Sequence, residues 1–260
     1  MSYILYKRGW IDKEDICKAE RLTEEQCEEL LSKDGLFVRC VYNFDCNKET
    51  KFWYVIKDFF GGIEELSSKK RNQVRKSMKI YDFKMVPKEE IVEYGLEIAN
   101  KALTHYRVKA KLIGQEQFEK DLEKGSQTDY WMVYEKATGK RVAFSINTVF
   151  NEYCDYSTLK ADPAYLNNTY PYYGLIYEMN KYYLKEKGLR FVCDGARSLT
   201  EHSHIQSFLI NTFCFRKAYC EMEIHYKWLK KVVNMLYPFR KFIKHPIVTA
   251  LMNQEEWSRS

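Results

Sequence analysis

The sequence predicts a mixed α/β fold, with a central, twisted, mixed sheet that carries helices on both faces. Residues 169–195 carry most of this prediction. In them a tyrosine-rich turn leads into a helical pattern that ends at Gly188, and a short apolar strand follows at residues 191–193. Residues 141–159, just before the turn, have the composition of two strands. Such a strand–loop–helix–strand unit either packs the core or holds a ligand beyond its strand ends.

The composition favours a cytoplasmic protein with one large domain or two lobes. The chain has 260 residues, 45% of them hydrophobic, and a net charge of +6 that permits a phosphate-bearing or membrane-surface partner. The first residues lack a signal-peptide core, and no window approaches the ~20 apolar residues of a membrane-spanning helix. The 8 cysteines include no CxxC pair, so we expect buried thiols in a reducing compartment.

Residues 1–81 are expected to form an N-terminal region with a hairpin and a basic helix. Thr23 has the residue type of an N-cap for a helix at residues 23–32. Residues 36–42 and 51–57 are strand-like, and the turn-like residues between them predict a hairpin. Residues 66–80 predict a helix with a strongly basic face, which either docks phosphates of a nucleotide, tRNA or lipid, or is simply solvated.

Residues 82–226 are expected to form the main domain, and residues 227–260 a basic tail. The main domain should begin with a strand at residues 82–86 and end with a strand at residues 215–226. The tail mixes apolar side chains with lysine and arginine, and prolines interrupt it. It is expected to form a basic amphipathic helix that lies on an anionic membrane or packs on its own domain.

The predicted order from residue 82 onward, β–α–α–β–β–β–α–β–α–β, resembles the GNAT acyltransferase fold. Three stretches look most like the Fem-type branch of that superfamily, which includes the peptidoglycan aminoacyltransferases. Residues 66–79 are similar to its basic K-x-R-N-x-[IV]-R-K-x-x-K helix. Residues 173–188 are similar to its GL…E…Y…G helix, and residues 191–217 to its Asp-Gly turn and F…F-[KR] strand entry.

The resemblance implies an acyltransferase that moves an acetyl, other acyl or aminoacyl group to an amine or hydroxyl of a cell-envelope or nucleotide-sugar acceptor. It implies acyl-CoA or aminoacyl-tRNA as the donor and no tightly bound cofactor. GNAT enzymes that use acetyl-CoA usually carry an [RQ]-x-x-G-x-[GA] loop, whose backbone N–H groups hold the pyrophosphate. In residues 167–174 only Gly174 matches this loop, and Pro171 removes a donor. The resemblance also suggests a polysaccharide-biosynthesis context. Because Fem-type proteins commonly have two GNAT-like lobes, it implies that residues 1–81 form a reduced partner lobe.

The resemblance places the active site where two central strands, at residues 152–159 and 191–193, move apart. Backbone N–H groups of the first strand would stabilise the oxyanion. Asp155 and Tyr156 are candidates for base and acid, and Asp194 could orient the amine or sugar hydroxyl. The candidates each have a structural alternative, such as a turn former, a surface strand residue or a salt-bridge partner. Four further residues complete the expected site. Tyr172 and Tyr173 would line the donor channel, Gly174 would lie in the cofactor loop, and Arg197 would bind a phosphate or carboxylate.

No metal site is expected. His202 and His204, with Glu201 beside them, have the residue types of a metal site, but their spacing offers no convincing third ligand. They lie at a predicted helix start, which favours helix capping or a surface position. The alternative to an enzyme is a non-catalytic module of the same fold that docks a membrane-associated or polysaccharide-biosynthesis assembly through its basic helix and tail. That alternative places the protein at the inner membrane face. A third interpretation is tRNA binding through the basic helix, and no DNA partner is expected.

Overall fold

The structure is a computed structural model that describes residues 3–6, 8–12, 15–104, 111–122, 127–198 and 204–259. The chain divides into two compact units. The central unit comprises Val55–Gly195 and His202–Arg216. The terminal unit comprises Met1–Tyr54, Ala196–Glu201 and Lys217–Ser260.

These units differ from the three consecutive regions expected from the sequence, because strand pairing joins distant segments of the chain. In the terminal unit, strand β10 (Arg216–Tyr226) pairs antiparallel with β3 (Phe37–Tyr42). The tail that follows β10 therefore belongs to the same unit as the N-terminal residues. The basic helix α2 (Ser68–Ile80) belongs to the central unit.

The central unit is built on a sheet whose strands follow the order β9-β8-β7-β6-β5. β8 and β9 pair in parallel, and the other neighbours pair antiparallel. The strands have these bounds: β5 Tyr81–Val86, β6 Thr128–Glu135, β7 Arg141–Val149, β8 Tyr153–Ala161 and β9 Phe191–Ala196.

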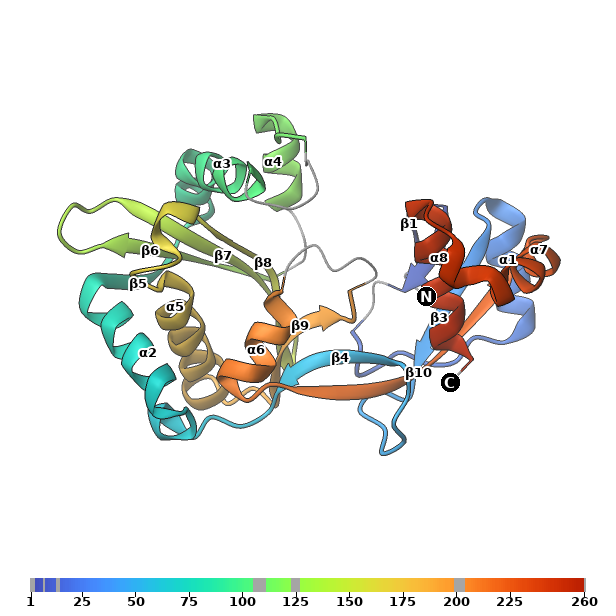
Figure 1. Ribbon diagram of the computed structural model, residues 1–260, viewed down its shortest axis with the longest axis horizontal. Coiled ribbons are helices and arrows are strands. Elements are labelled where there is room, and N and C mark those ends of the chain that lie inside the picture. The colour runs from blue at the N-terminus through green and yellow to red at the C-terminus, as the bar shows by residue number, and fades with distance from the viewer. Residues whose placement is uncertain are drawn as a thin grey trace. The chain divides into compact units, whose positions relative to one another are not determined.

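Helices cover both faces of this sheet, as predicted (Figure 1). α3 (Lys88–Thr104) and α4 (Gln115–Leu122) lie on one face, where Phe144 and Ile146 of β7 join their apolar side chains in a buried cluster. α2 and α5 (Pro171–Asn180) lie on the other face. The side chains of β7 are buried on both faces, including those of the polar residues Ser145, Asn147 and Thr148.

α5 continues into a π-helical segment, Lys181–Glu186, before the chain reaches β9. The backbone N–H of Lys187 donates to the carbonyl of Tyr182, five residues back. Gly188, with φ of +68°, then ends the helix in the left-handed region. Insertions of this kind in helices are frequent at functional sites. α6 (Ile205–Phe213) precedes β10.

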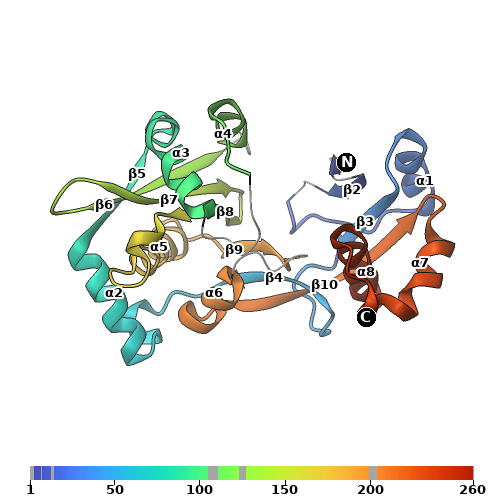
Figure 2. The ribbon, with the colours of Figure 1, turned by 45° about the horizontal axis from the view of Figure 1, so that its top comes forward.

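The terminal unit contains a sheet with the order β1-β2-β3-β10, in which β1 is Tyr3–Tyr6 and β2 is Gly9–Asp12. α1 (Glu24–Lys33), α7 (Lys230–Leu236) and α8 (Pro246–Ser258) accompany it (Figure 2). β4 (Phe52–Lys57) contributes residues to both units. No helix in the described ranges is long and apolar enough to cross a membrane.

The predicted start of the first helix is confirmed, and two other local predictions in the terminal unit are not. Thr23 caps α1 through a reciprocal capping box with Gln26. The hairpin is wrong, because β3 lies between β2 and β10 in the sheet. The predicted tail helix is divided: a 3₁₀ segment, Tyr237–Phe242, follows α7, and α8 begins at Pro246.

Candidate active site

The two parallel strands of the central unit pair over only three residues. Tyr153, Cys154 and Asp155 of β8 stand opposite Phe191, Val192 and Cys193 of β9. Beyond Asp155, β8 continues to Ala161 alongside β7, while β9 continues to Ala196 outside this parallel register. The strands thus separate at the position that the sequence predicts for the site.

Asp194 is the first residue of β9 beyond the paired region. Side chains alternate along a strand, and Asp155 stands opposite Cys193. Asp194 and Tyr156 therefore share a face of the sheet, and the hydrogen bond from Tyr156 to Asn180 identifies it as the face that carries α5. Asp155 lies on the opposite face. Burial and, second, the charge of Asp155 raise the pKa of Asp194 well above its usual value. A carboxyl with a raised pKa can take up and release a proton nearer neutral pH than an ordinary aspartate.

Tyr156 is buried, with 3% of its surface exposed. Its hydroxyl donates to Oδ1 of Asn180 at the end of α5, over 2.9 Å. Burial raises the pKa of Tyr156 well above its usual value, so the hydroxyl keeps its proton. The Nδ2 atom of the same Asn180 is buried and has no hydrogen-bond partner among the described residues. Tyr156 and Asn180 thus form a fixed polar contact beside Asp194.

Asp155 is held in place on the other face of the sheet. The hydroxyl of Ser157 donates to its Oδ2 atom over 2.8 Å. Thr148 Oγ1 lies 2.9 Å from the same Ser157 hydroxyl. The β7–β8 register shifts between Ile146 and Thr148, which marks an irregularity beside the point where β8 and β9 separate.

A buried polar network beside the point where β8 and β9 separate was not predicted from the sequence. Asn147 Nδ2 donates to the hydroxyl of Tyr183, which in turn donates to Oδ2 of Asp129 over 3.0 Å. Trp131 Nε1 donates to the same hydroxyl over 3.1 Å. The network fixes the π-helical segment, which contains Tyr183, against β6 and β7. The signal available in the sequence was Asn147, a polar residue inside an apolar strand.

The first turn of α5 offers few N–H groups to an anion. Pro171 has none, and that of Tyr173 donates to the carbonyl of Tyr170. The N–H of Gly174 donates to the Ser77 hydroxyl of α2 over 3.2 Å. A Cβ at Gly174 would lie 2.1 Å from Cζ of Phe83, so this glycine is required for close packing. A pyrophosphate site of the usual kind has little support here.

The predicted channel residue Tyr173 belongs to an aromatic cluster on the same face. Its ring centroid lies 5.0 Å from that of Phe208 and 6.0 Å from that of Phe213, both on α6. Its hydroxyl accepts from Nζ of Lys70 on α2 over 3.3 Å. Tyr172 precedes it in the first turn of α5 and is half-buried.

The basic helix α2 runs beside α5 (Figure 1), so its cations lie close to the start of that helix. Nζ of Lys76 lies 5.7 Å from the centre of the Tyr170 ring. Arg71 is ion-paired with Glu64. Four cations of α2 have exposed side chains: Lys69, Arg75, Lys76 and Lys79.

Arg197 lies in the terminal unit and makes structural contacts there. Its Nη1 donates to the carbonyl of Lys51 over 2.6 Å. Its guanidinium stacks 4.5 Å from the ring centre of Trp257. The predicted role of Arg197 in substrate binding stays a prediction. Of the histidine motif, Glu201 and His202 lie outside the described residues, and His204 directly precedes α6.

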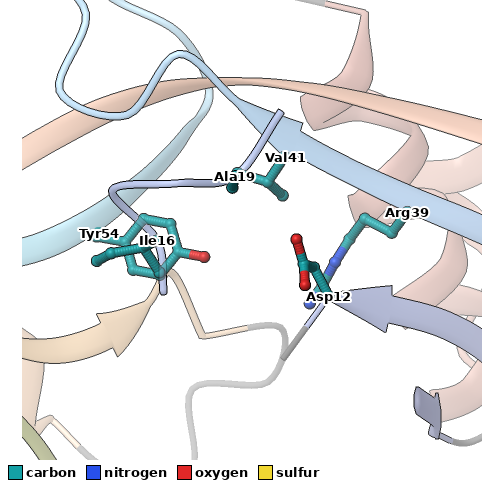
Figure 3. A pocket seen from close by; sticks show the side chains of 6 residues that line it. All are labelled: Asp12, Ile16, Ala19, Arg39, Val41 and Tyr54. Atoms are coloured by element: carbon teal, nitrogen blue, oxygen red, sulfur yellow. The ribbon is translucent and has the colours of Figure 1, made fainter. Parts of the chain in front are cut away.

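A small pocket in the terminal unit is lined by both charged and apolar side chains. Figure 3 shows Asp12 and Arg39 next to each other, across from Tyr54 and Ile16. Burial lowers the pKa of Arg39, and its Nη1 donates to Gln254 of α8 over 3.3 Å. The volume is about 30 Å³, which is far below the roughly 300–1,000 Å³ of ligand pockets.

Comparison with known proteins shows the fold. No family model and no curated protein matches the chain. The structure of FemX aligns with a TM-score of 0.57 at 10% identity, covering 85% of this chain and 78% of FemX. The C-terminal domain (DUF2156) of a candidate lysylphosphatidylglycerol synthetase from Agrobacterium fabrum aligns with a TM-score of 0.52 at 13% identity, covering 84% and 78%. A tandem GNAT protein from the clavulanic acid pathway aligns more weakly, with a TM-score of 0.43 at 11% identity, covering 78% and 67%.

The chain therefore has the GNAT/Fem-type acyltransferase fold, and this prediction from the sequence is confirmed. At these identities the likeness concerns the fold alone.

Proposed function

We propose that this chain is an acyltransferase that moves an acyl or aminoacyl group to an amine or hydroxyl of a cell-envelope precursor or nucleotide-linked sugar. The observation that carries the proposal is Asp194, a carboxyl with a raised pKa at the separation of β8 and β9 in a GNAT/Fem-type fold. Acyl transfer of this kind needs a close donor and acceptor and a group that moves one proton.

Asp194 would move that proton. The acceptor nitrogen or oxygen attacks the donor carbonyl carbon and forms the new bond, and its proton passes to the Asp194 carboxylate. The bond to the leaving sulfur or oxygen then breaks, and that atom takes the proton from Asp194. Tyr156 and Asn180 would hold the acceptor beside it, and backbone N–H groups of β8 would stabilise the oxyanion.

The donor would be acyl-CoA or aminoacyl-tRNA, with no tightly bound cofactor. Because the first turn of α5 offers few N–H groups, the donor phosphates need another anchor. The exposed lysines and arginine of α2 supply positive charge beside that turn. Tyr172 and Tyr173 would line the donor channel.

The proposal is tested by thermal-shift titration with acetyl-CoA, free CoA, longer acyl-CoAs and aminoacyl-tRNA, followed by transfer assays. A donor that binds only the folded chain raises its stability by about 2.7 kcal/mol at a hundredfold excess over Kd. With the donor that binds, Asp194→Asn should reduce kcat by roughly 10²–10⁴-fold and leave donor binding unchanged. The matched control is Asp121→Asn, an exposed aspartate of α4. Equal activity of Asp194→Asn and the control would refute the role of Asp194.

We propose a second candidate function, membrane docking through the tail, because of one specific observation. Half of the twelve exposed large apolar side chains in the described ranges lie within residues 228–247. Five of them recur at sequence spacings of three and four: Trp228 before α7, Val232 and Met235 in α7, and Phe239 and Phe242 in the 3₁₀ segment. Five lysines with exposed side chains lie among them: Lys227, Lys230, Lys231, Lys241 and Lys244.

Exposed apolar side chains interspersed with lysines match an anionic lipid surface, with apolar side chains at the acyl boundary and cations at the head groups. The protein would then be cytoplasmic and peripheral to the inner membrane face. Sedimentation with phosphatidylglycerol vesicles tests this. Phe242→Ser should weaken binding, while Met85→Ser, at an exposed apolar residue of the central unit, should not. Equal binding to phosphatidylcholine vesicles, or none to either, would contradict docking on anionic lipid.

A further inference from the structure

We propose that Cys27, Cys40 and His225 form a binding site for a borderline-soft divalent metal ion, of which Zn²⁺ is the best fit. The three residues come from α1, β3 and β10 of the terminal unit. Two thiolates and one imidazole are ligands that Zn²⁺ prefers, and three protein ligands leave a fourth position for water or a carboxylate.

The strand register brings the ligands to one face of the terminal sheet. Cys40 stands opposite Glu223, and His225 stands opposite Val38. Alternation therefore places Cys40 and His225 on the same face, where α1 presents Cys27. The neighbours Arg39 and Val41 point the other way.

The distances suit a tetrahedral ion. The two sulfur atoms lie 4.0 Å apart, and two thiolates bound to one Zn²⁺ at ~2.3 Å lie ~3.8 Å apart. One donor atom from each of the three residues lies within 4.8 Å of the others. Only small side-chain movements are needed to bring all three to bonding distance.

One buried nitrogen beside the sulfurs makes no hydrogen bond. Within the described part of the chain, Nε2 of His225 is one of four buried side-chain nitrogen or oxygen atoms without a hydrogen bond. Buried polar atoms without a hydrogen bond are rare, and ion binding is one explanation for them. In the neutral imidazole such a nitrogen has the lone pair that a metal ligand requires.

Glu223 is placed to support the site. Its Oε2 lies 3.5 Å from Nε2 of His225, and its carboxylate accepts from the hydroxyl of Tyr42 over 2.7 Å. Its Oε2 also accepts from Nε of Arg21 over 3.1 Å, so Glu223 is held where it can orient the imidazole. Metal binding would displace the protons of both thiols. A bound ion would tie α1 to the sheet.

The test uses the full chain, purified with a chelator and a non-thiol reductant and then freed of the chelator. Titration with Co²⁺ should give one ion per chain, with thiolate-to-cobalt charge-transfer bands and the visible bands of a tetrahedral site. One equivalent of Zn²⁺ should remove these bands. Cys27→Ser should abolish the charge-transfer intensity of at least one thiolate. His225→Ala should weaken Zn²⁺ by more than the roughly 10–100-fold that loss of an outer-shell partner costs.

His225→Ala is the variant least prone to misfold, because 30% of the His225 side chain is exposed. Cys220→Ser is the matched control, since Cys220 is buried in β10 outside the cluster. The control should keep the wild-type spectrum and affinity. Two results would each overturn the proposal: no charge-transfer bands in the wild-type chain, or bands unchanged in Cys27→Ser and His225→Ala. Metal binding is independent of acyl transfer, so the two proposals fail separately.

Discussion

The buried ion pair between Lys57 and Glu65 in the central unit makes the sharpest stability prediction. Lys57 Nζ lies 2.9 Å from Glu65 Oε2, and their side chains are only 2% and 10% exposed. The same Oε2 atom accepts the N–H of Gly61 over 3.1 Å. Each charge is thus stabilised chiefly by the other, because water has little access to either.

Glu65→Leu should lower the free energy of unfolding by about 3–5 kcal/mol, since it leaves the ammonium of Lys57 buried and unpaired. Lys57→Met should cost less, because Glu65 is the more exposed partner and keeps the N–H of Gly61. The double variant should recover most of the loss, because no uncompensated charge remains. A negative coupling energy of several kcal/mol is therefore expected in the double-mutant cycle.

Urea unfolding followed by circular dichroism measures the four stabilities, and hydrogen exchange assigns the loss to the central unit. The matched control is the exposed pair Lys120–Glu116 of α4, whose removal should change stability by less than ~1 kcal/mol. A loss below ~1 kcal/mol in Glu65→Leu, or additive losses in the double variant, would refute the reasoning.

Three further predictions concern the candidate active site. Asp194→Asn removes a carboxyl whose pKa is raised in the folded state. Because the folded chain holds this proton more tightly than the unfolded chain, the native chain should lose stability as pH rises from ~3.9 toward the raised value, and the variant should lose less. Parallel curves of Tm against pH for the native chain and the variant would contradict this. Gly174→Ala should lower the free energy of unfolding in urea by ~1–3 kcal/mol, because the new Cβ meets the Phe83 ring. Phe83→Leu in the same chain should restore part of that stability. An unchanged free energy of unfolding in Gly174→Ala would contradict the close packing. Tyr156→Phe leaves the buried Oδ1 of Asn180 without its donor and should cost ~1–3 kcal/mol, whereas a loss under ~0.5 kcal/mol would contradict a fixed contact.

Local signals in the sequence were sufficient for most elements, and non-local pairing was not. Thr23 and Gln26 define the start of α1 within four residues of each other. The turn-like residues 43–50, by contrast, carry no information that β10, far along the chain, pairs with β3. The short strands β1 and β2 were missed because each has only four residues, and most residues of β1 are exposed.

The candidate site was partly predictable for the same reason. Asp194 follows the apolar residues 191–193 and precedes a glycine, which placed it just beyond the predicted strand. In the structure β9 extends to Ala196, so Asp194 lies inside the strand and beyond its pairing with β8. The hydrogen bond of Tyr156 to Asn180 joins β8 to α5, and sequence spacing does not encode it. Gly174 was expected at a cofactor, whereas the structure gives it contacts with Phe83 and Ser77 that only close packing brings about.

The central claim is that the donor binds where β8 and β9 separate. Hydrogen–deuterium exchange of the full chain, with and without saturating acyl-CoA or aminoacyl-tRNA, tests it most directly. We predict that one donor slows exchange in residues 153–161 and 191–195 and at the start of α5. Protection confined to other segments, or none with any donor, would contradict the claim.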